Sequence, residues 1–124
     1  MPVPLTVTYD NGQRYATVRA EVIPGDLVSE RFSLPGYALR SLTTNGAIGA
    51  ATYTSSEMQT VAQADDADAA MVRIPGAVLA ADGMVRLDSS GLGFEQAAYR
   101  FSATMSAGSL RMTAVFIRER AHNS

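Results

Sequence analysis

The sequence predicts an all-β domain, an antiparallel β-sandwich of the immunoglobulin-like or jelly-roll-like kind with at most one or two short helical turns. Turn-forming residues recur roughly every ten residues, as in sandwich domains. Apolar and polar residues alternate between these turns, whereas helical periodicity is scarce. The 124 residues have the length of one domain, so residues 1–124 are expected to share a single core.

The start of the chain predicts a β-hairpin. Apolar residues alternate with polar ones over residues 5–9 and again over 16–22, on either side of Asn11-Gly12. An Asn-Gly pair is a strong hairpin signal, because both residues tolerate a positive φ. Pro24-Gly25 is expected to end the second strand.

The remaining strands are predicted from the same alternation between turn signals. Strands are expected over 27–34, 47–54, 71–74, 84–88, 94–105 and 110–117, with turns at 35–36, 45–46, 75–76, 82–83 and 107–108. Glu30 interrupts an apolar face, which favours an edge position for its strand. The last run is apolar on both faces, which favours a central strand.

Residues 55–70 differ in character from the predicted strands. Ser56 and Gln59 have the spacing of a capping box, which predicts a short helical start. The acidic residues that follow predict a surface loop within 55–70, and the C-terminal residues 119–124 are expected to form a flexible tail. Residues 32–39 resemble 72–79, and each copy predicts a strand, a Pro-Gly corner and one helical turn.

Composition removes most enzymatic chemistry from consideration. All ten basic residues are arginine, cysteine is absent, and the only histidine, His122, lies near the C-terminus. Thiolate and amine nucleophiles are therefore excluded, and no catalytic residue, metal site or cofactor is expected. The protein is expected to be non-enzymatic. An alternative, a small enzyme with a carboxylate pair, would use Glu30 or Glu95.

Charge and hydropathy also limit the partners. The net charge is −2 and the arginines are dispersed along the sequence, which argues against nucleic acid as a partner. No run approaches the ~18 apolar residues of a membrane-spanning helix, and the N-terminus lacks the pattern of a signal peptide. We therefore expect no membrane contact and no signal-dependent export.

The candidate functional residues are those suited to protein contacts. Tyr15, Thr17 and Arg19 should share the polar face of the first hairpin, and an exposed Tyr-Arg face is typical of interfaces. Tyr37 and Arg118 complete the predicted interface set.

A family resemblance gives these expectations a biological setting. Residues 5–10 with 17–20, and residues 72–75 with 79 and 82–87, resemble small β-sandwich domains of tailed-bacteriophage structural proteins. The resemblance implies a capsid decoration, cement, tail or baseplate protein, made in the host cytoplasm and built into the virion. Its partners would be other virion proteins and copies of itself.

A rival hypothesis is a carbohydrate- or receptor-binding β module. It would use exposed tyrosines and the acidic loop, with calcium at Asp65, Asp66 and Asp68. The loop lacks the closing glutamate of an EF-hand, so a solvated acidic loop is the preferred interpretation.

Overall fold

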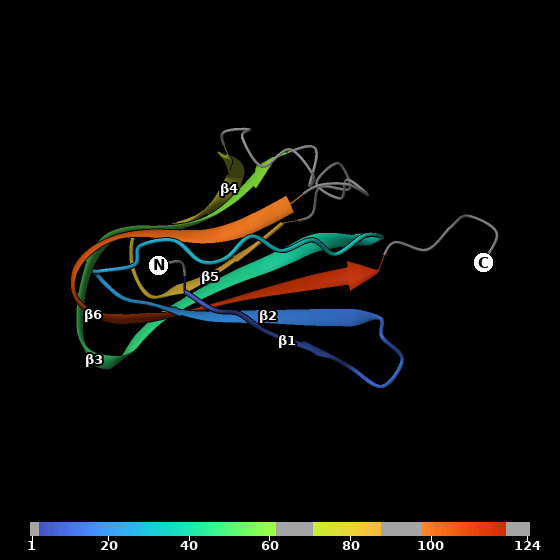
Figure 1. The fold of residues 1–124 in the computed structure, drawn as a ribbon, viewed down its shortest axis with the longest axis horizontal. Coiled ribbons are helices and arrows are strands. Elements are labelled where there is room, and N and C mark those ends of the chain that lie inside the picture. Colours follow the sequence, from blue (N-terminus) through green and yellow to red (C-terminus); the bar gives the residue numbers. More distant parts are fainter. Residues whose placement is uncertain (1–2, 62–70, 88–97, 119–124) are drawn as a thin grey trace.

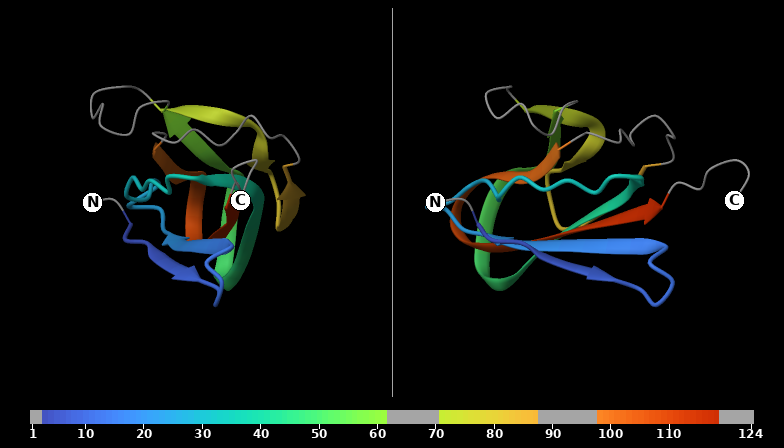
Figure 2. Two further views of the ribbon diagram at one scale, coloured as in Figure 1. Left: turned by 90° about the vertical axis from the view of Figure 1, so that its right-hand side faces the viewer. Right: turned by 45° about the vertical axis from the view of Figure 1, so that its right-hand side comes forward.

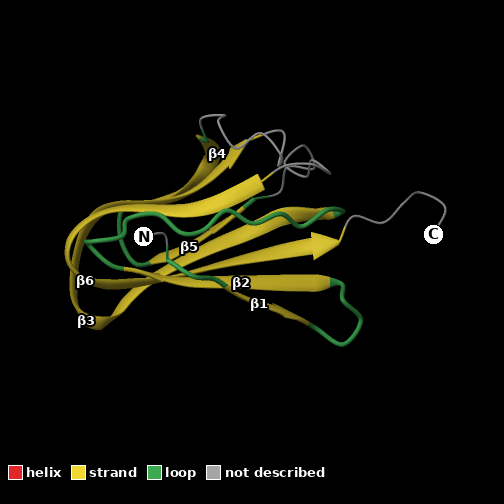
Figure 3. Cartoon of the chain, in the orientation of Figure 1, coloured by secondary structure: helices red, strands yellow, loops and turns green. Residues whose placement is uncertain are grey.

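The computed structural model describes residues 3–61, 71–87 and 98–118, and the regular structure in these ranges is all strand (Figure 1 and Figure 3). The strands are β1 (Thr6–Tyr9), β2 (Tyr15–Val22), β3 (Tyr37–Val61), β4 (Val72–Leu79), β5 (Gly83–Arg86) and β6 (Ala98–Arg118). Every pairing between these strands is antiparallel. The predicted all-β antiparallel class is confirmed. The described residues contain no helix that could cross a membrane.

The strands form one sheet in the order β1-β2-β6-β3-β4, with β5 paired to β3 outside this path. The C-terminal part of β6 lies between β2 and β3, since Val22–Tyr15 of β2 pair with Leu110–Ile117. The central position predicted for residues 110–117 is therefore confirmed.

The sheet forms two layers because its two longest strands, β3 and β6, fold over together (Figure 1). Phe116 and Tyr99 lie 17 positions apart on β6, yet their ring centroids are 5.1 Å apart. In a straight strand they would be separated by about 56 Å. Thr44 and Ser56 of β3 show the same folding, because their hydroxyl oxygens lie 2.8 Å apart in the interior.

We call the two layers the hairpin layer and the opposite layer. The hairpin layer contains β1, β2, β5, the first part of β3 and the last part of β6, and the opposite layer contains β4 with the remaining parts of β3 and β6. Figure 2 shows β1 and β2 on one side of the molecule and β4 on the other.

The core lies between the layers and is built from inward-facing residues of both. Phe116 of the hairpin layer packs its ring edge against Phe32, 5.8 Å away, and against Tyr99 of the opposite layer. The largest apolar side chains that are almost fully buried are Tyr99, Phe101, Phe116, Leu39, Leu42, Met58, Ile74, Leu110 and Met112.

The first hairpin is confirmed, but its turn has a different conformation. Thr6–Tyr9 pair with Arg19–Ala16 in the expected register. A positive φ of 54° occurs at Gln13 rather than at both Asn11 and Gly12. The amide of Gln13 donates to the Asp10 carbonyl at 3.0 Å, so the loop is longer than a two-residue turn.

Three predicted turns are wrong because the strands continue through them. β3 runs without interruption through Asn45-Gly46, β4 through Pro75-Gly76, and β6 through Ala107-Gly108. The β3–β6 register shifts repeatedly between Asn45 and Ser55, which bends both strands at one place. The turn residues therefore produce bends and bulges within paired strands.

The predicted helical turns are also wrong in the described residues. Gly36 and Gly76 both have a positive φ, 83° and 85°, but Gly36 leads directly into β3 and Gly76 lies within β4. Residues 55–61, expected to begin an acidic loop with a capping box, belong to β3. Pairing with both β4 and β6 satisfies their backbone groups, so tertiary pairing outweighs the local helix signal.

Residues 27–34 do not form the predicted regular strand. They follow β6 through isolated bridges, Val28 with Ser102 and Phe32 with Tyr99. Glu30 is exposed, in keeping with an irregular edge. Residues 62–70 of the expected acidic loop, the start of the strand expected from residue 94 and the predicted tail 119–124 lie outside the described residues.

Candidate binding face

The outer side of the hairpin layer is a broad sheet face built by strict alternation. Ala16, Val18 and Ala20 of β2 point into the core and are buried. Tyr15 and Arg19 therefore point outward, and Tyr15 remains 41% exposed. We call this surface the outer face.

The registers between neighbouring strands show that the outer face extends over all five strand segments of the hairpin layer. Thr17 lies opposite Val115, which in turn lies opposite Ser41, and Ser41 lies opposite Arg86 of β5. Side chains in such directly opposed positions are neighbours on one face. Further positions of the face, from the same registers, are Thr6, Thr8, Arg19, Glu21, Thr43, Met84, Arg111, Thr113 and Ile117.

Arginines that are dispersed in the sequence gather on this face. Arg19, Arg86 and Arg111 come from three different strands, and Arg40 joins them at the β3 edge of the same surface. The ion pair from Arg111 to Glu21 is long, 3.9 Å, and about half of each side chain is exposed. Such a surface pair adds little stability.

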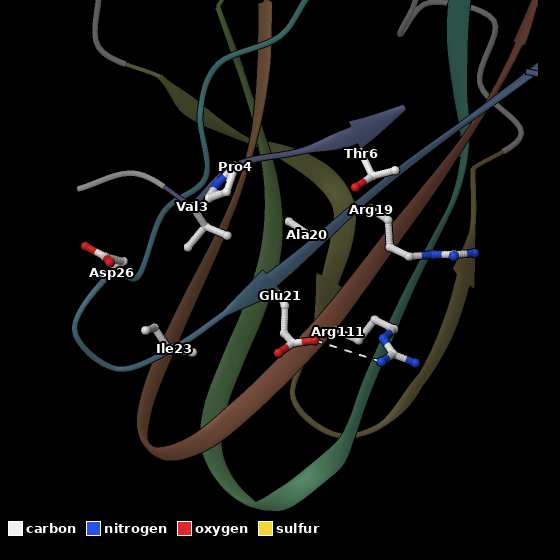
Figure 4. Close-up of a pocket in the computed structure, with 9 residues that line it drawn as sticks. All are labelled: Val3, Pro4, Thr6, Arg19, Ala20, Glu21, Ile23, Asp26 and Arg111. Atoms are coloured by element: carbon white, nitrogen blue, oxygen red, sulfur yellow. Dashed lines mark ion pairs between the residues drawn. The ribbon is translucent and has the colours of Figure 1, made fainter. Parts of the chain in front are cut away.

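Among the described residues, the outer face contains a pocket of about 800 Å³ (Figure 4) and a smaller one. The larger pocket lies where the N-terminal segment and the residues after β2 meet the sheet. Figure 4 shows Thr6 beside Arg19, and Glu21 beside Arg111, with Asp26 and Ile23 on the opposite side of the pocket. Its two arginines are matched by two carboxylates, so the larger pocket has no dominant charge.

The second pocket, of about 510 Å³, has a different chemistry. Its lining consists of Tyr15, Arg40, Ser41, Met84, Arg86 and Val115. The lining combines two arginines with apolar and aromatic side chains, and it contains no acidic residue among the described residues. We call it the arginine pocket.

The structure separates the five predicted interface residues into two groups. Tyr15, Thr17 and Arg19 share the outer face. Tyr37 is only 7% exposed, and its hydroxyl donates to the carbonyl of Gln13 at 2.5 Å. The Arg118 guanidinium lies 5.5 Å from the centre of the Tyr37 ring. Tyr37 and Arg118 therefore hold the hairpin loop against β3 and β6, whereas the other three residues lie on the outer face.

Sequence reasoning missed four residues of the arginine pocket: Arg40, Ser41, Met84 and Arg86. They come from β3 and β5, which lie far from β2 in the chain and meet it only through β6. The sequence did contain one signal for this pocket. Residues 110–117 are apolar on both faces, which places the apolar side chains of Val115 and Ile117 on the outer face.

The described residues contain no group of three carboxylate, histidine or cysteine side chains that could hold a metal ion. The alternative calcium ligands Asp65, Asp66 and Asp68, together with Glu95 and His122, lie outside the described residues.

The Tyr53 phenol has a shifted pKa. Burial raises the pKa of Tyr53 to about 12, with further contributions from its hydrogen bond to Asp82 and from that negative charge. The same Asp82 oxygen accepts the Tyr53 hydroxyl at 2.5 Å and the Gly46 amide at 3.1 Å. These hydrogen bonds connect two parts of β3 across its bend. A phenol with so high a pKa is a poor acid–base group at neutral pH.

No protein-family model matches the chain, and no curated protein matches it. Among solved structures, the chain is similar to a Drosophila melanogaster CENP-C domain, with 14% identity, 90% of this chain and 72% of that chain covered, and a TM-score of 0.41. It is also similar to Co(II) HppE in complex with Tris buffer, with 13% identity, 94% and 55% coverage, and a TM-score of 0.41. The chain spans about half the length of that HppE chain. At these scores the similarities carry no argument about function.

Proposed function

We propose that this chain is a non-enzymatic structural domain that joins copies of itself and other proteins through its outer face, as a component of a bacteriophage virion. The observation that carries the proposal is the composition of that face. Tyr15 and Met84 are exposed beside several arginines. Tyrosine, methionine and arginine are the residues enriched in protein interfaces.

The shape of the surface supports the same proposal. A sheet face with side chains from five strand segments can contact a partner over a wide area, as stable protein interfaces require. The virion setting is proposed from the resemblance of residues 5–10 with 17–20, and of residues 72–75 with 79 and 82–87, to tailed-phage structural domains.

Self-association tests the joining role. Sedimentation velocity over a concentration series is expected to show dimers or larger species for the native chain. Thr17→Asp places a charge in the middle of the outer face and is expected to shift the distribution to monomer. Thr104→Asp is the matched control, because Thr104 is an exposed strand residue of the opposite layer. A native chain that is monomeric at every concentration would contradict homo-oligomerisation. Two variants that behave alike would contradict the outer face as the joining surface.

The virion setting has its own test. Mass spectrometry of purified phage particles produced from the genome that carries this gene is expected to detect the chain at the abundance of a structural protein. Its absence from intact particles would contradict the virion role and leave the joining role to be judged from sedimentation.

A further inference from the structure

We propose that the arginine pocket binds an acidic segment of a partner protein, with Arg40 and Arg86 holding a carboxylate of that segment. This inference rests on the proposed function, because it takes the occupant to be a protein. It assigns a defined chemical role to one end of the outer face.

A β-bulge in β3 places two polar residues in the arginine pocket. Leu39 pairs with Phe116 and Ser41 with Val115, so Arg40 is an extra residue in the β3 strand. In a regular strand Arg40 and Ser41 would point to opposite faces. The bulge turns both toward the same pocket, and bulges commonly re-aim side chains in this way.

The polar groups of the pocket have no partners within the described chain. Neither the Arg40 nor the Arg86 guanidinium forms a hydrogen bond or ion pair with a described residue. Ser41 is only 8% exposed, and its hydroxyl also lacks a described partner. No described side-chain oxygen is both buried and without a partner, so the Ser41 hydroxyl must be accessible to solvent. Ser41 lies directly opposite Arg86 on the neighbouring strand and lines the same pocket, so its hydroxyl is positioned to bond the same ligand.

The cationic groups select a carboxylate. Guanidinium groups bind carboxylates through two parallel hydrogen bonds, and two arginines with no competing acid favour a negatively charged occupant. The larger pocket lacks this preference, because Glu21 and Asp26 balance its arginines.

The apolar lining selects a peptide rather than nucleic acid. Met84 is 57% exposed and lies with Val115 and Tyr15 around the arginines, which suits the aliphatic part of a side chain. A nucleic-acid site neutralises many phosphates along a strand, whereas this pocket supplies two cations. A protein segment that alternates acidic and apolar side chains fits both features.

Fluorescence anisotropy with a labelled hexapeptide of alternating glutamate and valine tests the proposal. The native chain is expected to bind this peptide and not its glutamine-valine counterpart. Arg40→Gln with Arg86→Gln is expected to abolish measurable binding, and Ser41→Ala to weaken it about tenfold, because each removes hydrogen bonds to a charged group.

A matched control removes the same charge elsewhere. Arg73→Gln with Arg100→Gln changes two arginines of the opposite layer, which pair with Glu57 and Gln59. This variant is expected to bind the peptide like the native chain. Circular dichroism and urea unfolding of both double variants establish that they remain folded.

The following results would overturn the inference: no binding of the acidic peptide, equal weakening by both double variants, or tighter binding of inorganic phosphate or oligodeoxythymidine at the pocket. Its failure is distinguishable from failure of the proposed function. A chain that self-associates without binding the peptide retains the joining role and loses this pocket assignment. A monomeric chain that binds the peptide through Arg40 and Arg86 retains the assignment and loses homo-oligomerisation.

Discussion

Replacing Phe116 with alanine tests whether the two halves of β6 stabilise the fold by packing against each other. The Phe116 side chain is fully buried, and its ring contacts Phe32 and Tyr99 at centroid distances of 5.8 and 5.1 Å. Truncating such a phenylalanine removes its burial and leaves a cavity, at a combined cost of about 3–5 kcal/mol. A domain of this size has a free energy of unfolding of about 5–15 kcal/mol.

Urea unfolding followed by circular dichroism measures this loss as a lower midpoint with an unchanged m-value. Phe116→Leu keeps most of the apolar volume and is expected to cost about 1–2 kcal/mol, so it reports on the site even where the alanine variant does not fold. Val72→Ala is the control, because Val72 is 61% exposed and its truncation should cost less than about 0.5 kcal/mol.

A cost below about 1 kcal/mol for Phe116→Ala would refute the packing of the two layers through this ring. A large loss for Val72→Ala would show instead that the sheet is sensitive to any change.

Three further predictions concern the β3 bend and the hairpin loop. Because folding raises the pKa of Tyr53 from 10 to about 12, its neutral form stabilises the fold below pH 10 and that stabilisation is lost as pH rises toward 12. For the native chain we expect the free energy of unfolding to fall by about 1 kcal/mol, after solvent screening, between pH 9 and 12. Urea unfolding over this pH range should show a smaller decrease for Tyr53→Phe, because this variant lacks the phenol group. Gly46→Ala would place its Cβ 2.9 Å from the Ala51 Cβ, so calorimetry should show a loss of about 1–3 kcal/mol, and unchanged stability would contradict the close approach. Tyr37→Phe removes the hydrogen bond to the Gln13 carbonyl and should speed amide hydrogen exchange in the 10–14 loop more than in β4; equal exchange in both would contradict that tether.

The local pattern predicted those parts of the fold in which neighbouring residues decide the outcome. Alternation in residues 5–9 and 16–22 correctly places Ala16, Val18 and Ala20 in the core and leaves Tyr15 and Arg19 outside. The central strand at 110–117 was predicted from a different local pattern, a run that is apolar on both faces. In the hairpin, burial on one face fixes the side-chain pattern, whatever the remaining chain does.

Local signals failed where a distant strand supplies the competing interaction. Asn45-Gly46 and Ala107-Gly108 are turn sequences, but β3 and β6 pair on both sides of them, so the chain bends there without reversing. The capping box at Ser56 and Gln59 does not begin a helix for the same reason, because this part of β3 pairs with both β4 and β6.

The residues of the outer face were likewise predicted in part from the sequence and in part found only in the structure. The sequence by itself determined that Tyr15, Thr17 and Arg19 would share an exposed side of one strand, because alternation is a property of consecutive residues. Only the tertiary structure brought Arg40, Ser41 and Arg86 to that side, through pairing across three strands and a bulge that shifts the β3 register. Such pairing depends on contacts between residues far apart in the chain, and no local pattern of residue types encodes which of them meet.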